Sequence, residues 1–184
     1  MRVLAVSGSL RRGSHNTQLL RAAAEAAPEG VEVELFEGLE RVPPYDADLD
    51  GPEPVPEVAR LREEWGRADA ILFATPEYNG SVPGVLKNAV DWASRPRLEA
   101  PLTGKTVAVV GASTGQFGAM WAQADLRRIL GIAGARVVGD ELPVTHAHEK
   151  FDAQGRLLDP ELFERLSIVL ETLEREAAPV AVAA

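Results

Sequence analysis

The sequence contains no cysteine. Thiol nucleophiles, thiolate zinc sites and iron–sulfur clusters are therefore excluded. It also lacks an apolar run of membrane-spanning length, and no short apolar segment typical of secretory signals precedes the first predicted strand. We expect a cytoplasmic protein that neither enters nor binds a membrane.

Basic residues are in the minority, with 19 Lys and Arg against 28 Asp and Glu and a formal net charge of −9. This balance argues against a general nucleic-acid binder, which would need a basic face. Hydrophobic and charged fractions of 46% and 26% are ordinary for a globular protein, and 184 residues suit one domain spanning 1–184. Arginine outnumbers lysine, which fits a thermophilic source and a GC-rich genome equally well.

Short runs of Val, Ile, Leu and Ala alternate with stretches whose apolar residues recur at helical spacing. The predicted strands are residues 3–6, 31–36, 70–74, 106–110 and 135–139. The predicted helices are residues 17–27, 56–68, 85–94, 120–132 and 160–177, with Asp159 as the N-cap of the last. The alternation predicts an α/β three-layer sandwich with a parallel sheet. In such sheets ligands bind at the carboxyl ends of strands, so the loops after the first, third and fourth strands should converge.

The first of these loops, residues 7–17 (loop 1), reads S-G-S-L-R-R-G-S-H-N-T and precedes a helix, an arrangement typical of an anion site. Gly8 and Gly13 have the spacing of a Walker loop. However, Ser14 and His15 stand where that motif requires Lys and then Ser or Thr. A terminal monophosphate is thus a better candidate than a β/γ-phosphate. The alternative is an ordinary turn capped by Ser14, with solvated arginines.

The other two loops are also unusual. Residues 75–84 (loop 2) read T-P-E-Y-N-G-S-V-P-G, and Tyr78 adds an aromatic face to a rigid turn that could lie along a flat heterocycle. Residues 111–118 (loop 3) read G-A-S-T-G-Q-F-G, and this spacing departs from the dinucleotide motif G-x-G-x-x-G. Its small residues would still let the backbone approach a ligand closely, and its N–H groups could form an anion nest. A surface turn and a glycine-rich connector are the alternatives.

Three segments, residues 8–16, 76–92 and 111–118, resemble the NADPH-dependent FMN reductase family, which includes bacterial chromate, quinone and azo reductases. The resemblance implies a flavodoxin-like fold with a five-stranded parallel sheet in the order 2-1-3-4-5, and bound FMN. It implies that the FMN phosphate is held by Ser9, Arg11, Ser14, Asn16 and Thr17. The residues it places along the isoalloxazine ring are Pro76, Glu77, Tyr78, Asn79 and Gly80. Those it places near the pyrimidine edge are Ser113, Thr114 and Gly115.

The same resemblance implies an oxidoreductase that passes two electrons from NADPH or NADH through FMN. The implied acceptors are quinones, azo or nitro compounds, chromate-like oxyanions and free flavin. Because the flavin carries the chemistry, no catalytic side chain is predicted. The resemblance also implies a homodimer or homotetramer with residues 85–92 near the subunit interface, although the apolar side of that helix fits ordinary core equally well. A flavodoxin-type electron carrier without nicotinamide turnover is the main alternative, and a regulatory nucleotide-binding module is a third.

Several other residues that could bind a metal or a ligand are interpreted as structural or as solvated. His146 and His148 lie near Asp140 and Glu141, and we interpret them as solvated loop residues rather than metal ligands. We therefore predict no metal site. Trp65, Trp92 and Trp121 are interpreted as core or interface residues. Phe117 and Trp121 remain candidates to border the substrate pocket.

Overall fold

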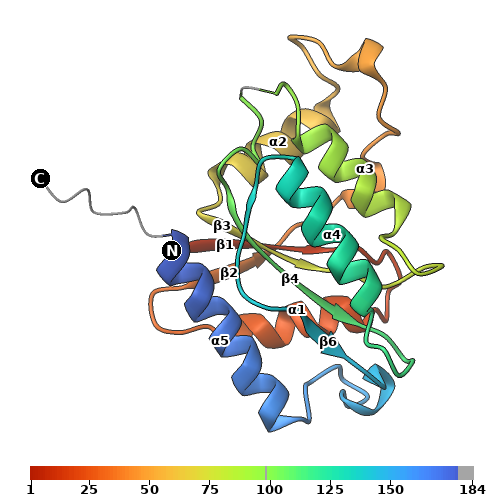
Figure 1. Ribbon diagram of the computed structural model, residues 1–184, viewed down its shortest axis with the longest axis vertical. Coiled ribbons are helices and arrows are strands. Elements are labelled where there is room, and N and C mark those ends of the chain that lie inside the picture. The colour runs from red at the N-terminus through yellow and green to blue at the C-terminus, as the bar shows by residue number, and fades with distance from the viewer. Residues whose placement is uncertain (98, 178–184) are drawn as a thin grey trace, which may run out of the picture.

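A parallel β-sheet forms the centre of the computed structural model, which describes residues 1–97 and 99–177 (Figure 1). Its strands are β1 (Arg2–Ser7), β2 (Glu32–Leu35), β3 (Ala70–Ala74), β4 (Thr106–Ala112), β5 (Arg136–Val137) and β6 (Leu142–Val144). The order is β2-β1-β3-β4-β5, and β6 also pairs with β4. This order confirms the predicted flavodoxin-like α/β arrangement.

The fifth position of the sheet is divided between two short strands, where the sequence analysis expected one strand over residues 135–139. Strand β5 pairs with the beginning of β4, and β6 pairs with its end. Between them the chain turns away at Gly139, whose φ is +65°. The guanidinium of Arg127 holds this detour by donating to the carbonyl oxygens of Gly139 at 2.7 Å and Val138 at 3.4 Å. The sheet therefore has six strands rather than five.

Two helical layers cover the sheet (Figure 1). The helices are α1 (His15–Glu25), α2 (Pro56–Arg67), α3 (Gly84–Ala93), α4 (Met120–Ile132) and α5 (Pro160–Ala177). Alternate residues of β1 point to opposite faces: Val3 and Ala5 pack with α1 and α5, whereas Leu4 and Val6 pack with α2, α3 and α4. Strands β3 and β4 are buried along their whole length, which explains their continuous apolar sequences.

The tryptophans divide between the core and the surface. Trp65 and Trp92 are fully buried, as expected for core residues. Trp121, on α4, is 47% exposed and does not join this core, which corrects the core interpretation for that residue.

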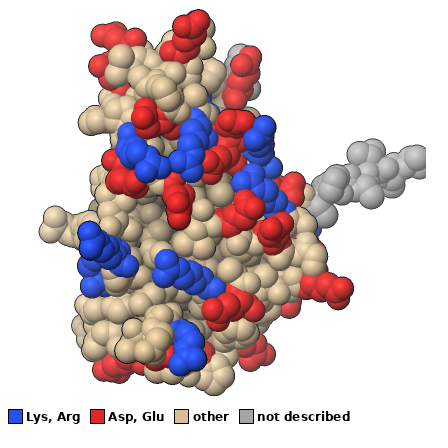
Figure 2. Space-filling model, turned by 180° about the vertical axis from the view of Figure 1, so that it is seen from behind, with Lys and Arg blue, Asp and Glu red and all other residues tan. Residues whose placement is uncertain are grey.

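The molecular surface carries charges of both signs. On the face shown in Figure 2, lysines and arginines are interspersed with acidic side chains rather than gathered into one basic field. None of the helices in the described ranges is both long and apolar enough to cross a membrane.

Candidate functional site

Strands β1, β3 and β4 are parallel neighbours, so loops 1, 2 and 3 emerge at the same edge of the sheet. All three loops contribute to one hollow of about 320 Å³. The predicted residues that line it are Ser9, Arg11, Ser14, Asn16, Pro76, Glu77, Tyr78, Ser113 and Thr114. Thr17, Asn79, Gly80 and Gly115 are not among the lining residues, whereas His15 and Ala112, which were not predicted, are.

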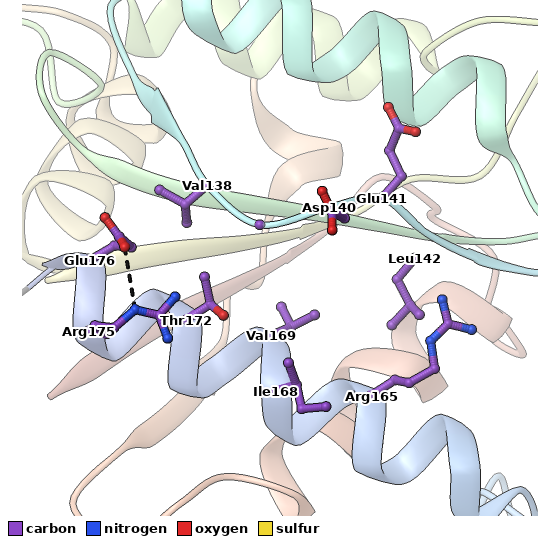
Figure 3. Close-up of a pocket in the computed structure, with 11 residues that line it drawn as sticks. Val138, Asp140, Glu141, Leu142, Arg165, Ile168, Val169, Thr172, Arg175 and Glu176 are labelled. Carbon is purple, nitrogen blue, oxygen red and sulfur yellow. Dashed lines mark ion pairs between the residues drawn. The ribbon is translucent and has the colours of Figure 1, made fainter.

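A larger pocket of about 620 Å³ lies elsewhere, between α5 and residues 138–142 (Figure 3). Apolar side chains such as Val169 share its wall with charged groups, including Arg175 and Glu176, which form an ion pair at 3.4 Å. None of its lining residues belongs to loops 1–3. The convergence of chemically unusual loops therefore selects the smaller hollow as the candidate site.

Ser14 ends loop 1 as the N-cap of α1. Its Oγ accepts the backbone N–H of Thr17 at 3.3 Å, and its own N–H donates to the carbonyl oxygen of Arg11 at 3.1 Å. Because this capping bond uses Oγ as an acceptor, the hydroxyl hydrogen of Ser14 is left to donate to a ligand. A small polar N-cap thus places a donor at the positive end of the helix dipole.

Loop 1 presents further donors. Within the described residues, no hydrogen bond engages the backbone N–H groups of residues 10–13. The guanidinium of Arg11 is exposed, and it has no ion-pair partner in the described part of the chain. Free backbone donors, a helix N-terminus and an unpaired guanidinium are the components of an anion-binding site.

Two predicted residues of loop 1 make contacts inside the protein. Asn16, which is only 3% exposed, donates from Nδ2 to the carbonyl oxygen of Ala112 at 3.0 Å and accepts the Ala112 N–H at Oδ1 at 2.9 Å. Thr17 donates its hydroxyl to Ser7 Oγ at 2.9 Å. Asn16 therefore fastens loop 1 to the end of β4, and Thr17 fastens the helix to the end of β1.

Loop 2 forms a tight turn at Asn79 and Gly80. The backbones of Tyr78 and Ser81 exchange two hydrogen bonds, at 3.1 and 3.2 Å, and the two central residues have φ values of +53° and +73°. Positive φ at both central positions is the requirement that favours an Asn-Gly sequence. The turn leaves Tyr78, which is 54% exposed, at the wall of the hollow.

The side chain of Glu77 reaches from loop 2 to the beginning of α4. Its Oε2 accepts the N–H groups of Trp121 at 3.0 Å and Ala122 at 3.1 Å. The N-cap position of α4 is Ala119, whose side chain cannot cap, so Glu77 supplies the missing acceptor. The family resemblance placed Glu77 along the flavin ring and did not indicate this capping contact. The absence of a capping side chain before α4 was the signal for this role.

Loop 3 is held by the chain that follows β6. Ser113 donates its N–H to the carbonyl oxygen of Val144 at 3.0 Å and accepts the N–H of Ala147 at its own carbonyl oxygen at 3.0 Å. Its Oγ accepts the N–H of Gly115 at 3.1 Å. The backbone N–H of Thr114 has no partner in the described residues and remains free at the hollow.

Two glycines allow the loops to approach one another. A Cβ on Gly8 would lie 2.8 Å from Cδ2 of Leu86 and 3.2 Å from Cδ of Pro76. A Cβ on Gly111 would lie 2.9 Å from the carbonyl oxygen of Thr75. Glycine at these two positions therefore allows close contact between loops 1 and 2 and between loop 2 and β4.

His15 is the side chain of the hollow that sequence reasoning missed. Its ring stacks on Phe151 with centroids 5.9 Å apart and an angle of 14°, and its Nδ1 lies 2.9 Å from Oε1 of Gln18. Its position directly after the Ser14 N-cap was the available signal, because the first helical residue lies beside any anion bound there.

The remaining candidates lie outside the hollow. Phe117 and Trp121 form an exposed aromatic pair with centroids 4.7 Å apart at the beginning of α4, and neither lines the hollow. The rings of His146 and His148 are 6.4 Å apart. Among the described residues, no group of three or more His, Asp or Glu side chains is placed to hold a metal ion.

Comparison with known proteins identifies relatives of this chain. The sequence model of the family described as NADPH-dependent FMN reductase matches residues 1–149. An NAD(P)H-dependent FMN reductase of Pseudomonas aeruginosa is 45% identical over 175 residues, which are 95% of this chain and 94% of that protein. A 2-hydroxy-1,4-benzoquinone reductase of Burkholderia sp is 36% identical over 173 residues, or 93% of each chain.

A solved structure extends the similarity to three dimensions. The flavoenzyme NAD(P)H:(acceptor) oxidoreductase of Paracoccus denitrificans matches with a TM-score of 0.85 at 33% identity, covering 95% of this chain and 98% of that one. The family match spans well over half of the sequence, and the relatives align along almost its whole length. The chain therefore belongs to the NADPH-dependent FMN reductase family.

Proposed function

We propose that the hollow binds FMN and that the protein uses it to pass electrons from NADPH or NADH to a quinone. The observation that carries this proposal is the convergence of loops 1, 2 and 3 on one hollow at the carboxyl edge of the sheet. The names of the relatives support the reaction, since one is an NAD(P)H-dependent FMN reductase and another a benzoquinone reductase.

The donor set of loop 1 fits the phosphate of FMN. Arg11 and Ser14 line the hollow, and both the Arg11 guanidinium and the Ser14 hydroxyl can donate to a phosphate. The free backbone N–H groups of residues 10–13 belong to the same loop. Ser9 also lines the hollow. Asn16 and Thr17 were expected to contact the phosphate, but their side chains bond to Ala112 and Ser7. We therefore assign these two residues to holding the shape of the phosphate site.

Loops 2 and 3 fit the flat ring. Pro76, Glu77 and Tyr78 line the hollow, and the N–H groups of Asn79 and Gly80 have no partner among the described residues. On the opposite side, the N–H groups of Ser113 and Gly115 are already engaged, which leaves that of Thr114 to meet the pyrimidine edge. A backbone donor there would stabilise negative charge on the reduced ring.

Bound FMN supplies the chemistry, accepting a hydride from the nicotinamide and returning two electrons to the acceptor. The protein must therefore bind and orient the ring and leave one face open. Oε2 of Glu77 accepts two N–H groups at the beginning of α4, so we assign this side chain a structural role.

The proposal extends to the range of acceptors, the oligomeric state and the cellular location that the family resemblance implies. The acceptor range includes azo and nitro compounds, chromate-like oxyanions and free flavin, because an open ring face admits acceptors of different shapes. The protein acts as a homodimer or homotetramer in the cytoplasm. A flavodoxin-type carrier remains the second candidate, since the same hollow would hold FMN without a nicotinamide reaction.

A series of absorbance measurements tests the proposal. The purified protein is reconstituted with FMN, freed of excess cofactor, and mixed without oxygen first with NADPH or NADH and then with benzoquinone. We expect a flavin spectrum that bleaches with nicotinamide and returns with quinone. Absence of bound flavin would refute the site, and flavin that nicotinamide does not bleach would identify a carrier. Azo dyes and chromate in place of benzoquinone then rank the acceptors.

A further inference from the structure

The imidazole of His15 has a fixed position at the end of the hollow where loop 1 meets α1. Phe151 covers one face of the ring, and Gln18 Oε1 lies 2.9 Å from Nδ1. Gln18 is itself confined, because Gly155 packs so closely that a Cβ there would lie 2.9 Å from Gln18 Nε2. Two contacts, one to a ring face and one to a ring nitrogen, hold the imidazole in one orientation.

The second ring nitrogen, Nε2, is free. No hydrogen bond to it is made within the described residues, and His15 shares the wall of the hollow with Ser9, Arg11 and Ser14. When Nδ1 is the donor in the contact with the Gln18 amide oxygen, the neutral ring presents a lone pair at Nε2. A neutral His15 therefore offers no donor to an anion in the hollow, whereas a protonated His15 offers a charged one.

Among the described residues, no acidic side chain forms an ion pair with His15. From loop 1 the nearby charges are the cations Arg11 and Arg12. From loop 2 the hollow contains Glu77, whose Oε2 is bonded to α4.

The segment that carries Phe151 also contributes charges to this neighbourhood. They occur as two internal ion pairs, Lys150 with Asp159 at 2.6 Å and Arg156 with Asp152 at 2.7 Å. An anion bound in the hollow is thus the partner that would favour protonated His15.

We propose that protonated His15 is a ligand of the FMN phosphate, so that FMN binding takes up protons. This inference rests on the proposed FMN site, but it concerns one residue of that site and a property that FMN binding alone does not require. The affinity for FMN then rises as the pH falls from about 8 to about 6.5, because protonation adds a charged donor to the phosphate site. With a charge-assisted hydrogen bond of ordinary strength, we expect a gain of about five- to ten-fold over that range.

The test measures FMN affinity by quenching of flavin fluorescence at several pH values, and proton uptake by calorimetry in buffers of different ionisation enthalpy. The variants are His15→Gln, which keeps a polar side chain without a titratable charge, and His146→Gln as the matched control on an exposed loop. Riboflavin, which has the ring without the phosphate, is the second ligand. The ionisation of the phosphate itself, near pH 6, is common to all variants and cancels in the comparison.

The proposal predicts that wild type and His146→Gln take up protons and bind FMN more tightly at the lower pH. It also predicts that His15→Gln takes up fewer protons than wild type and loses the gain in FMN affinity at the lower pH, and that riboflavin shows neither effect. Equal pH dependence in wild type and His15→Gln would overturn the role of His15, as would the same dependence for riboflavin. Failure of the wild type to bind FMN at any pH would instead refute the proposed function.

Discussion

The side chain of Asn16 replaces a strand partner for Ala112, accepting its N–H at 2.9 Å and donating to its carbonyl oxygen at 3.0 Å. Ala112 is the last residue of β4, where the chain leaves the sheet. A single amide thus completes the backbone hydrogen bonding of Ala112 and joins the beginning of loop 3 to loop 1. The relative position of the two ends of the hollow depends on this one residue.

Replacing Asn16 with Ala should therefore reduce both stability and FMN affinity. The change leaves a buried N–H and a buried carbonyl oxygen without partners, and we expect the free energy of unfolding to fall by about 2–4 kcal/mol. Urea denaturation measures this loss. Asn88→Ala is the matched control, since Asn88 also bridges backbone groups, those of Pro43 and Tyr45, but lies outside the hollow.

Asn88→Ala should lower stability while leaving FMN affinity near that of wild type at a temperature where the variant is folded. Asn16→Ala should weaken FMN binding under the same conditions. If both variants lower stability and neither changes affinity, Asn16 has no role in shaping the site.

Arg11→Ala should weaken FMN binding selectively. Its guanidinium lines the hollow and has no ion-pair partner in the described residues, so its contact with a phosphate would be charge-assisted. We expect a loss of about 1.5–3 kcal/mol, or roughly ten- to a hundred-fold in affinity. Isothermal titration with FMN measures the loss, and Arg12→Ala provides the control because Arg12 does not line the hollow. Equal losses in the two variants would show a general charge effect instead of a specific contact.

The sequence predicts most of the fold because the controlling signals are local. The buried strands β3 and β4 were recognised from continuous apolar runs. The spacing of apolar residues placed all five helices within two residues of their observed ends. The split of the last strand was missed because it depends on Arg127, a residue of α4 that is distant from the detour in sequence. A contact made by a side chain of another element leaves no hydrophobic pattern in the sequence of the strand that it interrupts.

In the candidate site, too, local features of the sequence were predictive and contacts between distant segments were not. The composition of loops 1, 2 and 3 indicated a ligand site at the strand ends, and the resemblance to the FMN reductase family named most of the residues that line the hollow. The individual roles were less predictable. Asn16 and Glu77 were predicted to lie beside a ligand; both line the hollow, and their side chains also bond to Ala112 and to the beginning of α4. Sequence alone does not distinguish a polar group that meets a ligand from one that holds the loop in place.

Glu77→Ala should loosen the first turn of α4. The variant removes the only side-chain acceptor recorded for the N–H groups of Trp121 and Ala122 in the described residues, and loss of a helix cap costs about 0.5–2 kcal/mol. Hydrogen exchange at these two amides should accelerate. Glu77→Gln keeps an acceptor oxygen and should retain most of the protection, losing only the smaller interaction of the carboxylate with the helix dipole. Unchanged exchange in Glu77→Ala would exclude the capping role.

Asp159 joins the beginning of α5 to the preceding segment through two separate contacts. As predicted from the sequence, it is the N-cap of α5, with Oδ1 accepting the Leu162 N–H at 3.1 Å. Its other oxygen, Oδ2, accepts from Lys150 Nζ at 2.6 Å. These bonds, that from Lys150 foremost, lower the pKa of the Asp159 carboxyl group below its ordinary value of 3.8. The hydrogen bond and the charge of Asp159 also raise the pKa of Lys150 above 10.5.

The direction of these shifts sets the pH dependence of stability. Because the pKa of Asp159 is lower in the folded protein, its contribution is complete above the unfolded value of 3.8 and is lost as the pH falls through the folded value. Because the pKa of Lys150 is raised, its contribution is complete below 10.5 and is lost as the pH rises through the folded value. Between these limits the ion pair is fully formed.

Asp159→Asn separates the two contacts, since asparagine keeps the N-cap but removes the charge that pairs with Lys150. At pH 7 we expect this variant to be less stable by about 0.5–1 kcal/mol, the scale of a partly exposed ion pair. Asp159→Ala removes the cap as well and should cost about 1 kcal/mol more. Urea denaturation at pH 7 and at about pH 3 measures the differences. The gap between wild type and Asp159→Asn should shrink at the lower pH, and a gap that stays constant would exclude the ion pair as its source.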